Sequence, residues 1–247
     1  MPRVEFVSLA GLRVDGRRPA EVRKLRCRMG LFGRADGSAY LEQGNTKAVA
    51  VVYGPKQITR RADALHDRAS VNCEFSTAPF AGSERKKVRA SDRRAAEASL
   101  MLKQTFEGVI QRHLYPRSQI DIFVQVLQAD GGERAAAINV ATLALIDAGI
   151  AMDDFVVACT AGFLDDTALL DLNSVETGPG GPRVEVAMVP QTGKLTAVQM
   201  ESRLPVDHFE AVLELALSGC RHIFDVLQAA VREHTLKRLD TRGVLPG

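Results

Sequence analysis

With 247 residues, 46% of them hydrophobic and 25% charged, the chain is long enough to bury a full core as one large domain or two small ones. Its formal net charge of +2 indicates no particular partner. No apolar run approaches the roughly 20 residues that cross a bilayer, and Arg3 and Glu5 interrupt any signal-peptide core, so we expect an intracellular protein with no membrane partner.

The first half of the chain shows the pattern of a sheet followed by a helix. Alternating apolar residues predict strands near residues 22–31, 38–43, 46–53 and 70–76, with Gly44 in the turn between the second and third strands. A helix is predicted over about 91–114, because one stripe carries Ala95, Leu102, Phe106, Val109 and Ile110.

The segment from Pro116 to Gly149 predicts a strand, a double-glycine turn and a buried helix. Residues 120–127 alternate as a strand does, and the residues from Arg134 onward are apolar on nearly every face. Gly131 and Gly132 then precede a helix N-terminus, where free N–H groups and the macrodipole favour phosphate. The alternative is a tight connection in which the glycines supply positive φ angles.

The last third predicts a second sheet and a long helix. Strands are expected near 155–163, 167–172, 183–190 and 194–200, and a helix from about Val206 to Leu239. Strands mixed with helices at this size indicate an α+β or mixed α/β fold with helices packed on mixed sheets. We expect a single domain over 1–240 and a flexible C-terminal tail at 241–247.

The cysteines and histidines carry no pattern that indicates a site. Cys27, Cys73, Cys159 and Cys220 are far apart, so we expect buried free thiols rather than a zinc site or a disulfide framework. The histidines are equally scattered. The sequence therefore predicts no bound metal and no cofactor.

Basic residues gather between Arg60 and Arg94, where they outnumber the acids. A nucleic-acid backbone is their natural partner, whereas 5% aromatic residues and no tryptophan argue against base stacking as the main source of affinity. The candidate RNA-binding residues are Arg93 and Arg94 first, then Arg68 and Arg134, with Arg61 and Arg117 weaker. The alternative is a surface on which these arginines pair with Asp63, Asp67 or Asp92.

Several ordered blocks make the chain resemble the RNase PH family, and within it the exosome ring subunits that are the eukaryotic counterparts of the catalytic archaeal subunit. The blocks are VDGRRPAEVRKL at 14–25, ADGSAYLEQGNTKAVAVVYGPK at 35–56, SDRR at 91–94, PRSQIDIFVQVLQADGG at 116–132, LALIDAGI at 143–150 and LLDLNSVE at 169–176. The resemblance implies the RNase PH fold, which is like domain 2 of ribosomal protein S5. It also implies a six-subunit ring with other RNase PH-like subunits and single-stranded RNA in the channel.

Active members of this family degrade RNA from its 3′ end by phosphorolysis, and the resemblance places their site on altered residues. The phosphate cradle, a Gly-Thr/Ser-Arg triplet, falls on Gly132, Glu133 and Arg134. The pair of aspartates falls on Asp171 and Thr177. A carboxylate at Glu133 about 4 Å from phosphate would oppose it by roughly 4 kcal/mol at an effective dielectric near 20.

The change at Thr177 is the more serious one for catalysis. A threonine can neither hold Mg²⁺ by charge nor act as a general acid near neutral pH. Glu176 would compensate only if its loop shifts register, and Asp171 would then remain as an anchor of its strand end. The acid pair and the cradle are therefore interpreted as vestigial.

We therefore expect a non-catalytic subunit that holds the ring together and lines the RNA path, in ribosomal RNA processing and messenger RNA decay. The implied partners are other RNase PH-like ring subunits, cap subunits, an attached hydrolytic nuclease and single-stranded RNA, in the nucleus, nucleolus and cytoplasm. The alternative is an active phosphorolytic exoribonuclease that uses Mg²⁺ and inorganic phosphate in a site shared with a neighbour. A third possibility is a stand-alone homohexamer like bacterial RNase PH.

Overall fold

The computed structural model describes residues 6–8, 10–58, 65–85, 87, 92–178 and 180–241. The strands are β1 (Leu25–Met29), β2 (Gly37–Gln43), β3 (Thr46–Gln57), β4 (Ser70–Thr77), β5 (Ser118–Gln128), β6 (Val157–Leu164), β7 (Thr167–Leu170), β8 (Arg183–Val189) and β9 (Lys194–Glu201). The helices are α1 (Arg93–Glu107), α2 (Glu133–Ala148), α3 (Ser174–Thr177) and α4 (Val206–Thr241), with a 3-10 turn, η2, at Arg112–Leu114. Within the described ranges, no helix is both long and apolar enough to cross a membrane.

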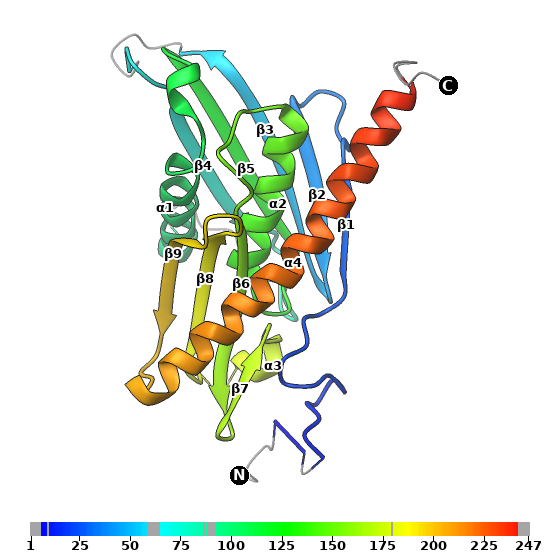
Figure 1. Cartoon of the computed structure of the whole chain (residues 1–247), viewed down its shortest axis with the longest axis vertical. Coiled ribbons are helices and arrows are strands. Elements are labelled where there is room, and N and C mark those ends of the chain that lie inside the picture. The colour runs from blue at the N-terminus through cyan, green and yellow to red at the C-terminus, as the bar shows by residue number, and fades with distance from the viewer. Residues whose placement is uncertain are drawn as a thin grey trace.

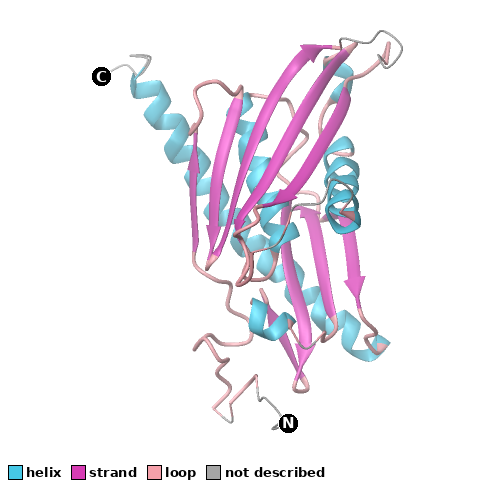
Figure 2. Ribbon diagram, turned by 180° about the vertical axis from the view of Figure 1, so that it is seen from behind, coloured by secondary structure: helices cyan, strands magenta, loops and turns pink. Residues whose placement is uncertain are grey.

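The strands form two sheets (Figures 1 and 2). The first sheet has the order β1-β2-β3-β5-β4, and all its pairs are antiparallel except β4 with β5. The second has the order β7-β6-β8-β9 and is antiparallel throughout. Parallel neighbours need a crossover, and α1 supplies it by packing on β4. The predicted α+β class with mixed sheets is confirmed.

Helix α2 joins the two sheets. It packs on β2 and β3 of the first sheet and also contacts β6 of the second. The side-chain amide of Asn139 donates to the carbonyl of Ala158 (2.9 Å) and its oxygen accepts from the N–H of the same residue (2.8 Å). Nearly every α2 position is buried, as its apolar composition predicts, and side chains from both sheets share one core. How the chain divides into domains stays a prediction.

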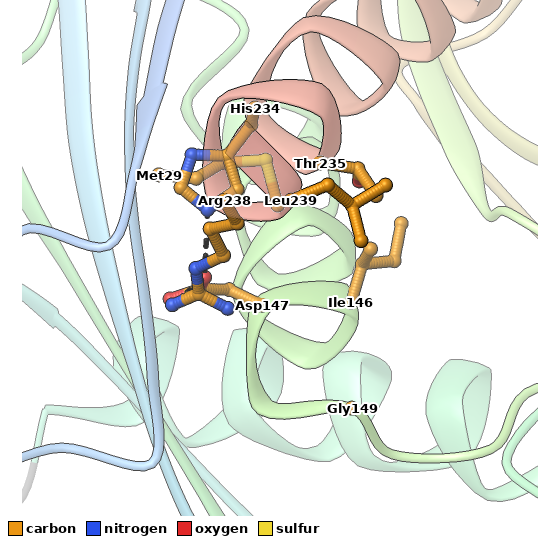
Figure 3. Close-up of a pocket in the computed structure, with 8 residues that line it drawn as sticks. All are labelled: Met29, Ile146, Asp147, Gly149, His234, Thr235, Arg238 and Leu239. Atoms are coloured by element: carbon orange, nitrogen blue, oxygen red, sulfur yellow. Dashed lines mark hydrogen bonds and ion pairs between the residues drawn. The ribbon is translucent and has the colours of Figure 1, made fainter. Parts of the chain in front are cut away.

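The long helix α4 crosses the second sheet and then reaches β1 (Figure 1). Beyond Leu227 it has no fully buried side chain, so its last part needs a polar attachment. Asp147 of α2 provides one, because its carboxylate contacts Nε2 of His234 (3.2 Å) and Nη2 of Arg238 (3.0 Å). Figure 3 shows these side chains converging in a pocket of about 260 Å³ between α2 and α4.

Most predicted elements agree with the structure within a few residues, and one does not. The helix predicted over 91–114 begins at Arg93 but ends at Glu107, with Gly108 as its C-cap. Val109 and Ile110 are buried as predicted, but they follow the helix, and Ile110 forms a bridge to Met152. The apolar stripe continued after the helix because these residues cover the same core. Helix α3 was not predicted.

The C-terminal residues and the four cysteines were also the subject of predictions from the sequence. Of the tail predicted at 241–247, Thr241 is the last residue of α4 and the rest lies outside the described residues. All four cysteines are free, with Cys73, Cys159 and Cys220 buried and Cys27 half-buried. Burial raises the pKa of Cys73 and Cys220 to about 12, so these thiols are protonated and unreactive.

Candidate functional site

The predicted glycine turn is present between β5 and α2. Gly131 and Gly132 have φ angles of 80° and 67°, and Gly132 is the N-cap of α2. A Cβ on Gly131 would lie 2.5 Å from the carbonyl oxygen of Leu172, and one on Gly132 would lie 3.1 Å from Nη2 of Arg23. Both glycines are therefore required by backbone conformation and by close packing against neighbouring segments.

Asp171 lies directly behind this turn and is fully buried. Its Oδ2 accepts from the backbone N–H (2.8 Å) and Nε (3.0 Å) of Arg23. Its Oδ1 accepts from Nη2 of Arg23 (2.8 Å) and from the amide of Gln43 (2.9 Å). A metal ion would have to displace several of these bonds, so the carboxylate is held as an anchor, the role that sequence reasoning considered for it.

Arg23 ties Asp171 to the glycine turn. Its Nη1 donates to the carbonyl of Asp130 (2.7 Å) and its Nη2 to the carbonyl of Gly131 (3.1 Å). Burial alone would lower the pKa of Arg23, but hydrogen bonds and charge from Asp171 outweigh it and raise the pKa. The guanidinium therefore stays charged inside the protein and fixes the position of the turn.

The acid that could replace the lost one is also engaged. Glu176 is buried, forms an ion pair with Arg13 and completes a capping box with Asn173 at the start of α3. Arg13 also reaches the carbonyl oxygen of Asp171 (Nη2 to O, 3.1 Å). Glu176 therefore belongs to the frame of the site and is not free to compensate for the missing aspartate.

Thr177 is the last residue of α3, and its side chain forms a local hydrogen bond. Its hydroxyl donates to the carbonyl of Asn173 (2.6 Å). Over the part of the chain that the structure describes, no group of three or more His, Cys, Asp or Glu side chains is arranged to hold a metal ion. The two positions that the resemblance assigns to the acid pair thus hold one fully bonded carboxylate and one helix-end hydroxyl.

The arginine of the cradle points to the second sheet. Nε of Arg134 lies 2.8 Å from Oε2 of Glu185, and its Nη2 pairs with Glu201, which also pairs with Arg183. Burial raises the pKa of Glu185 more than the two arginines lower it. Partial burial would also raise the pKa of Glu201, but hydrogen bonds and charge from Arg134 and Arg183 lower it instead.

The glycine turn therefore retains a helix N-terminus, but the charge of Arg134 is already balanced. Glu133, the first residue of α2, is half-buried at the same end of the helix. Gly132, Glu133 and Arg134 are contiguous at this N-terminus, as predicted, while the guanidinium is engaged by strands β8 and β9. An incoming phosphate would compete with two carboxylates for it.

The structure separates the predicted RNA-binding arginines into two groups. Arg93 and Arg94 open α1, which follows the carboxyl end of β4, and the glycine turn follows the carboxyl end of β5. Because β4 and β5 are parallel neighbours, these features share one edge of the sheet. Arg68 and Arg117 precede the two strands and lie at the opposite edge, about 25 Å away at roughly 3.3 Å per residue.

The individual arginines differ in their partners. Arg93 and Arg94 are exposed and form no ion pair among the described side chains, and Asp92 caps α1 by accepting from the N–H of Arg94 (3.0 Å). Arg68 pairs with Asp67 (Nη2 to Oδ2, 3.2 Å), as the alternative interpretation expected. Arg117 is exposed with a φ of 57°. Arg61 lies outside the described residues.

Sequence reasoning missed the residues that hold the site together. Arg13, Arg17 and Arg23 come from the segment before β1, which has little regular structure. The carbonyl of Asp171 accepts from both Nη atoms of Arg17, each at 3.1 Å. The sequence indicated these residues only by several arginines in and around the DGRR block at 15–18. Such a cluster does not distinguish buried from exposed guanidinium groups.

Comparison with known proteins places this geometry in a family. Residues 21–151 match the model described as "3' exoribonuclease family, domain 1", and residues 154–219 match its domain 2. The chain is 55% identical over 235 residues to "Exosome complex component RRP41" of Bos taurus, covering 95% of this chain and 96% of that one. It is 48% identical over 240 residues to the RRP41 homolog of Arabidopsis thaliana, covering 97% and 99%. The crystal structure of rice (Oryza sativa) Rrp46 superposes with a TM-score of 0.80 at 25% identity, covering 89% of this chain and all of that one.

Proposed function

The chain belongs to the 3′ exoribonuclease family of RNase PH-like proteins, and we propose that it is a non-catalytic subunit of an RNA exosome ring that lines the path of single-stranded RNA. Relatives that cover almost the whole chain are named as components of that complex, which supports the assembly. The neighbours would be other RNase PH-like subunits, together with cap subunits and an attached hydrolytic nuclease. Ribosomal RNA processing and messenger RNA decay in the nucleus, nucleolus and cytoplasm are part of the same proposal.

The state of Asp171 carries the non-catalytic proposal. Phosphorolysis needs an ionisable group or a metal ion near the leaving oxygen. Asp171 accepts four hydrogen bonds from Arg23 and Gln43, and Thr177 has no carboxyl group to pair with it. Glu176, the acid next to Thr177 in the sequence, is buried against Arg13. None of these three side chains is in a state to assist bond cleavage.

The exposed start of α1 supports the RNA path. Arg93 and Arg94 place two exposed guanidinium groups, without an ion pair among the described side chains, at the edge of the sheet that also carries the glycine turn. Guanidinium groups bind phosphate oxygens strongly and do not distinguish sequence. This arrangement fits a subunit that contacts RNA through its backbone while it passes.

The second candidate is an active phosphorolytic site shared with a neighbour, and one observation favours it. The N-terminus of α2 behind Gly132 is still built to receive an anion, and Arg134 keeps its charge because Glu185 and Glu201 outweigh the effect of burial and raise its pKa. Residues of the neighbouring subunit would have to supply the missing acid. Mg²⁺ and inorganic phosphate belong to this candidate alone.

One experiment separates the two. The ring is reconstituted with its neighbouring subunits but without the hydrolytic nuclease, and labelled RNA is supplied with inorganic phosphate. The proposal expects no nucleoside diphosphate above the background without protein. Phosphate-dependent release that is lost in a ring carrying Arg134→Gln would establish the second candidate and overturn the first.

A further inference from the structure

A groove of about 570 Å³ lies beside the glycine turn, and among the described residues that line it Phe80 is the one aromatic side chain. Phe80 is 67% exposed, the largest exposure of any aromatic residue among the large exposed hydrophobic side chains of the described chain. The polar side chains that line the groove are Asn45, Lys47, Ser83, Gln128 and Asp130. We propose that this groove holds a base of single-stranded RNA, stacked on the ring of Phe80.

The loop that carries Phe80 is anchored on both sides. The N–H of Ala78 donates to the carbonyl of Val126 (2.9 Å), and the N–H of Ala129 donates to the carbonyl of Ala81 (2.9 Å). Ala78 and Ala81 are each 4% exposed, so the residues on either side of the ring are packed into the protein. A loop whose backbone is held in place before binding loses little conformational freedom when a base stacks on the ring that it carries.

The lining of the groove matches a base better than an apolar side chain. A base has a π-face for the ring and polar edges for hydrogen bonds with side chains such as Gln128. An apolar occupant would cover Lys47 and Gln128 without satisfying their polar groups, which is costly. The negative charge of Asp130 is offset by nearby cations, because it interacts with the guanidinium of Arg23 and because Lys47 lines the same groove.

The position of the groove connects it with the proposed RNA path. The Phe80 loop follows β4, and the groove continues to Asp130 beside the glycine turn. The N–H of Phe75, near the end of β4, donates to Oγ of Ser99 in α1 (2.9 Å), which fixes α1 against this end of the sheet. Arg93 and Arg94 therefore provide phosphate contacts at the same edge at which Phe80 provides a stacking surface. The inference rests on the proposed function and assigns a base-binding subsite within it.

The test uses the reconstituted ring and single-stranded RNA in which 2-aminopurine replaces one base at a time. Stacking on Phe80 should quench the fluorescence at one position. Phe80→Leu should abolish that quenching and weaken binding by about 5- to 140-fold, the range for removing one base–aromatic stack. Phe80→Tyr keeps the ring and should restore both. Phe32→Ala, which removes another exposed phenylalanine far from the groove in sequence, is the matched control and should change neither.

The outcomes distinguish this inference from the proposed function. If Arg93→Gln with Arg94→Gln weakens RNA binding but Phe80→Leu leaves affinity and quenching unchanged, the RNA path stands and the stacking subsite is wrong. If quenching persists without the ring of Phe80, or if Phe80→Leu prevents ring assembly, the groove holds something else and the inference is overturned. If neither set of variants affects RNA binding, the proposed function itself fails.

Discussion

The guanidinium of Arg23 and the carboxylate of Asp171 form a buried bidentate ion pair, with Nε to Oδ2 at 3.0 Å and Nη2 to Oδ1 at 2.8 Å. The same guanidinium donates to the carbonyls of Asp130 and Gly131. Arg23, which lies outside the predicted site, thus fixes the position of the glycine turn. It also occupies the carboxylate oxygens of Asp171, which are then not available to a metal ion or a substrate.

Asp171→Asn is expected to destabilise the protein strongly. The substitution leaves the charge of Arg23 buried without its counter-ion, which costs about 3–5 kcal/mol of unfolding free energy. Urea unfolding of the purified chain measures this cost. Arg18→Gln, at an exposed arginine of the same segment, is the control and should change stability by less than about 0.5 kcal/mol. A change of similar size at Asp171 would show that the carboxylate is not an anchor.

Thr177→Asp places a carboxylate at the second position of the family's acid pair. We expect that this variant gains no phosphorolytic activity. Asp171 would still be bonded to Arg23 and Gln43, so the new carboxylate would have no partner with which to hold Mg²⁺. Loss of the hydrogen bond from Thr177 to Asn173 should lower stability by about 1 kcal/mol. Titration calorimetry with Mg²⁺ and the phosphorolysis assay of the ring measure both. Nucleoside diphosphate release from the Thr177→Asp ring alone would contradict the prediction.

The two glutamates that contact Arg134 should affect stability with opposite dependence on pH. The pKa of Glu201 is lowered from 4.5 on folding, so its contribution is present above pH 4.5 and is lost as the pH falls through the folded value. The pKa of Glu185 is raised from 4.5, so the folded state holds its proton longer and stability falls as the pH rises through that interval.

Urea midpoints between pH 3.5 and 7 for two variants measure this difference. Glu201→Gln should be less stable than the parent at pH 7 and approach it in acid. Glu185→Gln should remove a decline in stability above pH 4.5. Parallel pH profiles for the two variants would contradict the opposite shifts.

Arg93→Gln combined with Arg94→Gln should weaken RNA binding by the ring without disturbing its assembly. Two lost phosphate contacts should reduce the slope of log affinity against log salt by about 1.4, at roughly 0.7 for each contact with a single strand. Filter binding at several salt concentrations between about 50 and 200 mM measures this slope. Arg68→Gln with Arg117→Gln tests the opposite edge of the sheet separately. An unchanged slope in the first pair would remove α1 from the RNA path.

Asp147→Asn should loosen the last part of α4 while leaving the sheets intact. The side chain contacts His234 and Arg238, and α4 has no fully buried residue beyond Leu227. Amide hydrogen exchange should show a loss of about 1–3 kcal/mol of protection over residues 228–241 and little change in α2. Lys237→Gln, which breaks only an exposed pair with Glu233, is the control. Equal protection in both variants would contradict this role for Asp147.

The elements could be predicted from the sequence because their patterns are local. Alternation placed the strands, and the apolar composition of 134–148 predicted that α2 would be buried on nearly every face. The end of α1 was wrong because Val109 and Ile110 remain apolar after the helix stops at Gly108. A stripe reports which residues face the core, and it does not report the backbone conformation that brings them there.

The site was predictable in position but not in its bonds. The resemblance to the family implied that Gly132, Arg134 and Asp171 belong to one region, and the structure brings the turn and Asp171 together. The partners Arg23 and Gln43 are 148 and 128 residues from Asp171 along the chain, and single-sequence patterns do not couple such distant positions. Phe80 gave no signal, because an exposed aromatic in a short loop looks like any buried one in sequence.

The arginines that precede β1 limit which substitutions this region can tolerate during evolution. Arg13 and Arg23 pair with the buried acids Glu176 and Asp171, and Arg17 donates to the carbonyl of Asp171. Because Arg23 also donates to the carbonyl of Gly131 after the first sheet, these bonds hold the two sheets together. Replacing Asp171 would open that contact between the sheets, whereas the hydroxyl of Thr177 donates within its own short helix. Selection for a stable fold is therefore enough to preserve Asp171, so the presence of this carboxylate is not by itself a sign of catalysis.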